Sequence, residues 1–99
     1  MAVETVITTR KPETGIWWWE MYPEKMQVIL DHMKSHAGFI SYASTNIGDS
    51  KRVQTIVFDT QKNSSEYFKN LYSSCAEAAE RRQYNDDNGI STSASRNQI

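Results

Sequence analysis

The sequence predicts an α+β domain whose elements follow the order β-α-β-β-α-β. Two observations predict the helices, because apolar residues recur at helical spacing over residues 22–37 and again over 68–79. A third predicts the strands, since segments rich in β-branched residues stand before and between these helices. Because both helices are amphipathic, the stable arrangement is a four-stranded antiparallel sheet with the two helices on one face.

The first half of the chain contains a strand and a helix. Residues 2–10 are free of Gly and Pro and suit a strand, and residues 11–15, Lys-Pro-Glu-Thr-Gly, suit a turn. Pro23 fits the first turn of a helix, so the helix is expected to begin near Tyr22 or Pro23. Its apolar stripe comprises Tyr22, Met26, Ile29, Leu30, Met33 and Ala37. Gly38 is placed to end it, and Trp17 to Trp19 form its entry.

The second half begins with two strands, 39–46 and 52–59, whose short connection predicts an antiparallel hairpin. Asn63 followed by Glu66 is a capping signature for the second helix. One uninterrupted apolar stripe follows, made of Phe68, Leu71, Tyr72, Cys75, Ala78 and Ala79. This helix should end before Asn85. Residues 90–95 alternate weakly as a fourth strand, and residues 96–99 are expected to be frayed.

Size and charge restrict the classes of function. The chain has 99 residues, which fits a single domain over residues 1–99, and its net charge of −1 argues against nucleic-acid binding through phosphates. No apolar run approaches the roughly 20 residues of a membrane span, and the first ten residues do not look like a secretory signal. One cysteine forms no internal disulfide and no CxxC zinc site. We therefore expect a cytoplasmic protein.

Both faces of the sheet are expected to carry apolar side chains. Val53 and Val57 share one face of the third strand, and Ile56 and Phe58 share the other. A two-layer monomer would leave one of these pairs in water. Face-to-face pairing of two sheets would bury both, so we expect a homodimer.

Several local features together resemble the dimeric α/β-barrel superfamily, and within it the antibiotic biosynthesis monooxygenase-like group. The features span nearly the whole chain: a first strand ending in Thr9-Arg10, a long helix that runs into residues 36–42 (His-Ala-Gly-Phe-Ile-Ser-Tyr), the strand 55–59 followed by residues 63–68 (Asn-Ser-Ser-Glu-Tyr-Phe), and Tyr84-Asn85 leading to Gly89-Ile90. The resemblance implies a ferredoxin-like β-α-β-β-α-β sandwich whose sheet pairs with that of a second copy in a homodimeric α/β barrel.

Members of this group include cofactor-free monooxygenases that act on electron-rich aromatic compounds, haem-degrading enzymes, isomerases and proteins of unknown role. The haem-degrading pattern has an Asn on the first strand and a Trp that closes the third. Here the first strand has no Asn, and Phe58 takes the place of the Trp. The resemblance therefore implies an enzyme without metal, flavin or haem that takes an aromatic small molecule.

Candidate catalytic residues are His36, Tyr42 and Tyr72, and candidate ligand-binding residues are Trp18, Tyr22 and Phe68. A polar group beside a flat aromatic wall is what the chemistry of a phenolic substrate requires. Each residue also has a structural interpretation: His36 as a histidine at a helix C-terminus, Trp18 and Trp19 as a roof over the core, Trp17 as an interface residue and the tyrosines as packing. Arg10 and Arg52 are the basic residues expected nearest a pocket rim.

Other sites are less favoured by the sequence. His32 and His36 have the helical spacing of two metal ligands, but no carboxylate joins them as a motif, so no metal site is expected. Cys75 lies in the middle of an apolar stripe and is expected to be a small buried hydrophobe rather than a nucleophile.

Three functions are compatible with the features of the sequence. The first is the cofactor-free monooxygenase, and the second is a non-enzymatic dimeric module that binds a small ligand or only associates. The third is an RNA-binding domain, which shares the order of elements. Such a domain displays aromatic residues on its first and third strands, where this chain offers only Phe58. We therefore expect no nucleic-acid partner and no membrane partner.

Overall fold

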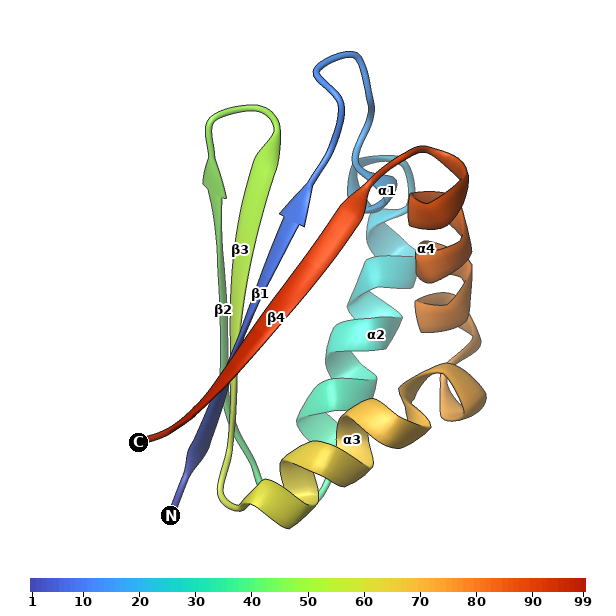
Figure 1. Ribbon diagram of the computed structural model, residues 1–99. Helices are drawn as coiled ribbons and strands as arrows, with labels where there is room; N and C mark the ends of the chain where they lie inside the picture. The colour runs from blue at the N-terminus through green and yellow to red at the C-terminus, as the bar shows by residue number, and fades with distance from the viewer.

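The computed structural model describes residues 1–99, and it confirms the predicted α+β fold. The elements are β1 (Val3–Arg10), α1 (Trp18–Met21), α2 (Pro23–Ser35), β2 (Phe39–Ile47), β3 (Lys51–Phe58), α3 (Gln61–Ser74), α4 (Ala76–Asp87) and β4 (Ser91–Gln98). The four strands form one antiparallel sheet in the order β2-β3-β1-β4. All four helices lie on one side of this sheet, and its other face is bare (Figure 1).

The strand register decides which side chains meet the helices. On β3, Ile56 and Phe58 point toward the helices and are buried, and Thr5 of β1 stands opposite Ile56. They join a core that includes Ile29 and Met33 of α2. Val53 and Val57 occupy the bare face, as the sequence predicts.

The second predicted helix is in fact two helices. At Cys75 the backbone leaves the helical region, with φ −132° and ψ 102°, so that Cys75 ends α3 and precedes α4. The side chain of Cys75 stays in the core, as its position in the stripe predicts. The change of direction lays α4 alongside α2 while α3 crosses below them (Figure 1).

The start of α3 also differs from the prediction. Its N-cap is Thr60, whose hydroxyl accepts a hydrogen bond from the backbone N–H of Asn63 at 3.1 Å. The Asn63 side chain has another role, because its amide donates to Asp59 Oδ1 at 2.8 Å. Asn63 therefore lies inside the first turn.

The chain end is paired rather than frayed. β4 runs to Gln98, with Gln98 opposite Val3 and Arg96 opposite Thr5. The backbone N–H of Ile99 also donates to Ala2 O at 2.9 Å. Backbone pairing with β1 orders this polar segment, whose side chains are all exposed and give little apolar signal.

Trp17 is buried within the chain, with 3% of its surface exposed, whereas an interface position was predicted for it. It stacks on Trp19 with ring centroids 4.7 Å apart and planes 16° apart. The prediction extended the phase of α2 backwards through the tryptophans. The backbone of Tyr22, with φ −129° and ψ 61°, separates α1 from α2 and breaks that phase.

Candidate functional site

A cavity of about 390 Å³ lies between the helix-covered face of the sheet and helices α3 and α4. This volume is in the range of small-molecule sites. The sequence explains why the core is unfilled here. Toward one end of the sheet, Ile56 and Phe58 give way to Gln54 and Thr9, which are buried but are polar and pack less completely.

Aromatic rings form much of the cavity wall. Tyr67, Phe68 and Tyr72 come from α3, and Trp19 comes from α1. Tyr67 and Phe68 meet edge to face, with centroids 5.0 Å apart. Ile7 and Ile56 add aliphatic surface from the sheet. A flat apolar ligand would find complementary surfaces on both sides.

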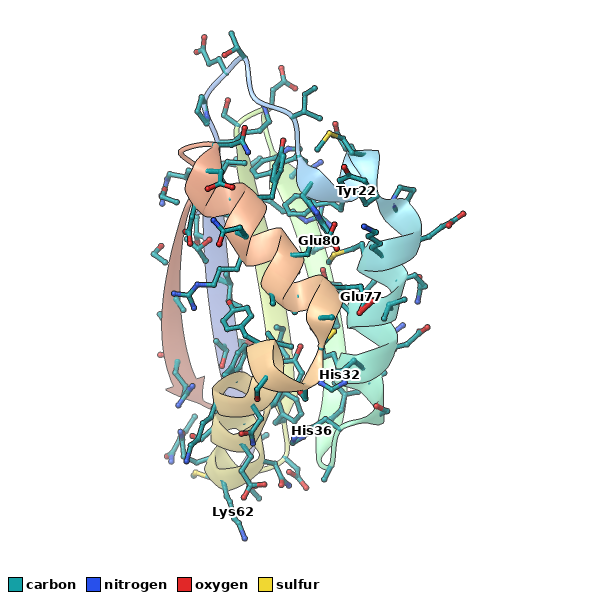
Figure 2. The ribbon with its side chains drawn as sticks, turned by 90° about the vertical axis from the view of Figure 1, so that its right-hand side faces the viewer. Tyr22, His32, His36, Lys62, Glu77 and Glu80 are labelled. Atoms are coloured by element: carbon teal, nitrogen blue, oxygen red, sulfur yellow. The ribbon has the colours of Figure 1, made fainter.

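The α4 side of the cavity is polar and carries charges of both signs. It is lined by Arg81, Arg82, Asn85 and Asp86. Neither arginine forms an ion pair, since the one ion pair of the chain joins Lys25 Nζ and Glu80 Oε1 at 2.7 Å on the outer side of α4 (Figure 2). Arg82 lies over the ring of Tyr72 at 4.8 Å. The Asn85 Oδ1 atom is buried and has no hydrogen-bond partner within the chain.

Tyr67 is the titratable group of this wall with a shifted pKa. Burial raises the pKa of its phenol far above the ordinary value, and the positive charge of Arg81 opposes this only in part. Tyr67 therefore stays neutral at physiological pH. Its O–H can donate a hydrogen bond beside the Arg81 guanidinium, and it cannot act as a base.

Two of the six predicted site residues line this cavity, Phe68 and Tyr72. Tyr42 lies on β2 with a buried hydroxyl that has no partner, and it packs against the core outside the cavity lining. Trp18 is 1% exposed in the core, and Tyr22 is exposed beside it, with ring centroids 5.7 Å apart.

His36 follows the last turn of α2 and also lies outside the cavity lining (Figure 2). Its ring meets Tyr67 and Phe58 edge on, with centroids 5.5 and 5.6 Å away. His32, one turn earlier, lies 3.2 Å from Ser74 Oγ through its Nε2 atom and so connects α2 to α3. The rings of both histidines thus lie near the ring of Tyr67, with centroids 6.2 Å away for His32 and 5.5 Å away for His36.

Sequence reasoning did not identify Tyr67, Trp19, Arg81 or Asn85 as site residues. Trp19 packs against the core, as its structural interpretation predicts, and it also lines the cavity, which Trp18 does not. Arg81 lies outside the predicted apolar stripe of a continuous helix, and the break at Cys75 changes which face of α4 meets the sheet. The adjacent pair of arginines in a slightly acidic chain was the available signal.

Two further features bear on the site. No group of three or more His, Cys, Asp or Glu side chains could hold a metal ion, and no helix is long and apolar enough to cross a membrane. A smaller cavity of about 230 Å³ lies beyond the tryptophans and is lined mainly by polar residues, with Trp17 as its aromatic wall. The stacked pair Trp17 and Trp19 thus contributes one ring to each cavity.

The architecture is ferredoxin-like, and solved structures of similar shape confirm the predicted fold. SnoaB from Streptomyces nogalater, a cofactor-independent oxygenase (its N63A mutant), matches with a TM-score of 0.75 and 10% identity, over 99% of this chain and 92% of that chain. A dimeric ferredoxin-like protein from an uncultured marine organism matches with a TM-score of 0.71 and 12% identity, over 99% and 94% of the two chains.

A candidate antibiotic biosynthesis monooxygenase from Deinococcus radiodurans has a TM-score of 0.62 and 8% identity, over 98% of this chain and 91% of that chain. No protein-family model matches the chain, and no curated protein matches its sequence.

Proposed function

We propose that this protein is a homodimeric, cofactor-free monooxygenase that oxidises a flat phenolic small molecule in the 390 Å³ cavity. The observation that carries the proposal is the composition of the cavity wall. Aromatic rings from α1 and α3 share the cavity with Arg81 and Arg82, which form no ion pair although the Asp86 carboxylate lines the same cavity. SnoaB, an oxygenase that needs no cofactor, has the same fold.

The chain's own groups suit the stabilisation of a substrate anion. A phenolic substrate that has lost a proton carries negative charge on its oxygen, and the Arg81 guanidinium and the neutral Tyr67 hydroxyl are donors for that oxygen. The anion is electron-rich enough to react with oxygen. When a ring methylene becomes a ketone, the carbon loses two hydrogens and gains one oxygen atom, and the second oxygen atom leaves as water. The protein contributes orientation, charge stabilisation and a site that excludes bulk water.

The homodimer follows from the bare face of the sheet. Val6 of β1 and Val53 and Val57 of β3 lie on that face, which no helix covers. Val6 and Val53 are partly exposed there, whereas Val57 is already buried, at 8% exposed. A second copy with the same face would bury both apolar surfaces. The marine relative with this fold is itself dimeric.

Oxidation of 1,8-dihydroxy-9-anthrone tests the proposed activity. We expect the protein to form the corresponding anthraquinone faster than buffer alone, with one O₂ consumed per product. Arg81→Gln should lower the rate by about a hundredfold, because it removes a charged donor from the anion. Arg10→Gln is the matched control, since Arg10 is an exposed strand arginine outside the cavity lining. Equal rates for wild type and Arg81→Gln would contradict the assignment.

A non-enzymatic ligand-binding module is the second candidate. One observation favours it: burial moves the pKa of Tyr67, the shifted group in the wall, away from the range of a working base. Binding of 1,8-dihydroxyanthraquinone without oxidation of the anthrone would support this module. Absence of both binding and oxidation would reject both candidates.

A further inference from the structure

We propose that Arg52 is a positioning residue for the ligand cavity, because it fixes the indole of Trp19 as a rigid wall; this role rests on the proposed function for the identity of the ligand. Trp19 lines the cavity, whereas Arg52 does not. Arg52 acts on the ligand site only through the ring it holds.

The element that carries Trp19 cannot fix that ring alone. α1 is a single turn of four residues, and no side chain caps its N-terminus. Its anchor is Trp18, which is 1% exposed in the core. Trp19 follows Trp18 on this short turn and is only half-buried. Its orientation must therefore come from outside α1.

Two other side chains pack on the Trp19 ring. Trp17 stacks on it with ring centroids 4.7 Å apart. The guanidinium carbon of Arg52 lies over the Trp19 ring, 4.6 Å from its centroid. Lys11 Nζ lies 5.4 Å from the Trp17 centroid, so each of the two stacked rings has a cation beside it.

The sheet holds Arg52 in turn. Its Nη2 donates to Ser44 Oγ at 2.7 Å, and its Nη1 donates to Asn46 Oδ1 at 3.0 Å. Both acceptors belong to β2, and Asn46 is the register partner of Arg52. A planar guanidinium can make both bonds while its face rests on an indole, whereas a lysine ammonium cannot. The orientation of the Trp19 ring is thus tied to the hydrogen-bonded strands β2 and β3.

The contact between Arg52 and Trp19 leaves polar groups buried without hydrogen bonds, which lowers the stability of the fold. Trp19 Nε1 and Arg52 Nε are buried donors with no partner in the chain. Unsatisfied buried donors destabilise a fold, and departures of this kind concentrate at functional sites. Trp19 lines the larger cavity, where a ring held in one orientation gives a bound ligand a fixed surface.

Fluorine NMR of protein labelled with 5-fluorotryptophan tests the positioning directly. The three tryptophans give three resonances, which Trp17→Phe and Trp19→Phe variants assign. In Arg52→Gln and Arg52→Lys we expect the Trp19 resonance to shift and broaden while that of Trp18 stays in place. Arg10→Gln, which removes an exposed strand arginine, should change neither resonance. An unchanged Trp19 resonance in both Arg52 variants would overturn the proposal, and Arg52→Lys covers the case in which Arg52→Gln fails to fold.

Ligand affinity tests whether the orientation of the Trp19 ring matters for the cavity. The Kd of 1,8-dihydroxyanthraquinone should rise about tenfold in both variants, with less change for the one-ring probe phenol, because only the longer ligand extends along the Trp19 wall. A shifted resonance with an unchanged Kd would also overturn the proposal. If wild type binds neither probe, the proposed function fails, and the positioning of Trp19 is decided by the resonances alone.

Discussion

At the scale of single residues, the chemistry of the site depends on a contrast between two neighbours. Arg81 brings a positive charge without a carboxylate partner, and Tyr67 brings a phenol that burial keeps protonated. In the proposed function, these two groups are the donors for a substrate oxyanion. Neither role follows from residue type, since most arginines are solvated and most tyrosines in an apolar stripe are packing. Burial and position, which are properties of the fold, separate them from the others.

The raised pKa of Tyr67 predicts how stability depends on pH. A phenol whose pKa is higher in the folded state favours folding while the unfolded chain remains protonated, and this contribution is lost as the pH rises above about 10. Between pH 10 and 11, wild type should lose about 1 kcal/mol of unfolding free energy more than Tyr67→Phe, as urea titrations would measure. Tyr72→Phe, the same change at a position 42% exposed, is the control. Parallel loss in wild type and Tyr67→Phe would contradict the prediction.

At the scale of elements, periodicity predicted the existence and order of the strands and the long helices, because an element with one buried face has apolar residues at a regular spacing. It could not predict the interruption at Cys75, since the apolar stripe continues through that residue without Gly or Pro. It also named Asn63 as the cap, because the capping signature is short and Thr60 carries the same chemistry. Tertiary packing, which the local sequence does not show, decides both the break at Cys75 and the choice of Thr60 as the cap.

The unpredicted interruptions of the helices affected the prediction of the site more than the prediction of the fold. Phe68 and Tyr72 were found because they precede the break and keep the phase of the stripe. Arg81 and Trp19 were missed because each lies beyond an interruption, at Cys75 or Tyr22, where the phase is lost. A helical wheel is valid only within one continuous helix.

The junction from α2 to β2 gives a prediction about an element boundary. Gly38 has φ +81°, and a Cβ there would overlap the Asp59 carboxylate and the Asn63 amide. Gly48 has φ +65° with open space around it. Gly48→Ala should therefore cost about 1 kcal/mol of unfolding free energy for its backbone alone, and Gly38→Ala about 3 kcal/mol because contacts must also shift. Chemical denaturation of both variants measures the difference, and equal losses would show that the contacts at Gly38 relax freely.

At the scale of the whole molecule, two layers leave one face of the sheet without a partner (Figure 1). The helices bury the side that carries Ile56 and Phe58, and the cavity forms where that packing ends. The opposite side carries Val53 and Val57 and is the surface through which the proposed dimer would form. The cavity and the proposed dimer surface thus lie on opposite faces of one sheet, because side chains alternate between the two faces along each strand.

A single charge on the bare face should therefore break the dimer and leave the cavity intact. Val53→Lys places an ammonium on the face through which the proposed dimer forms, where association would bury it away from water. Native mass spectrometry should give twice 11.4 kDa for wild type and 11.4 kDa for this variant. Val28→Lys is the control, because Val28 is 45% exposed on α2, away from the sheet, and that variant should stay dimeric. A wild-type monomer at micromolar concentration, or a Val53→Lys variant that remains dimeric, would exclude this face as the interface.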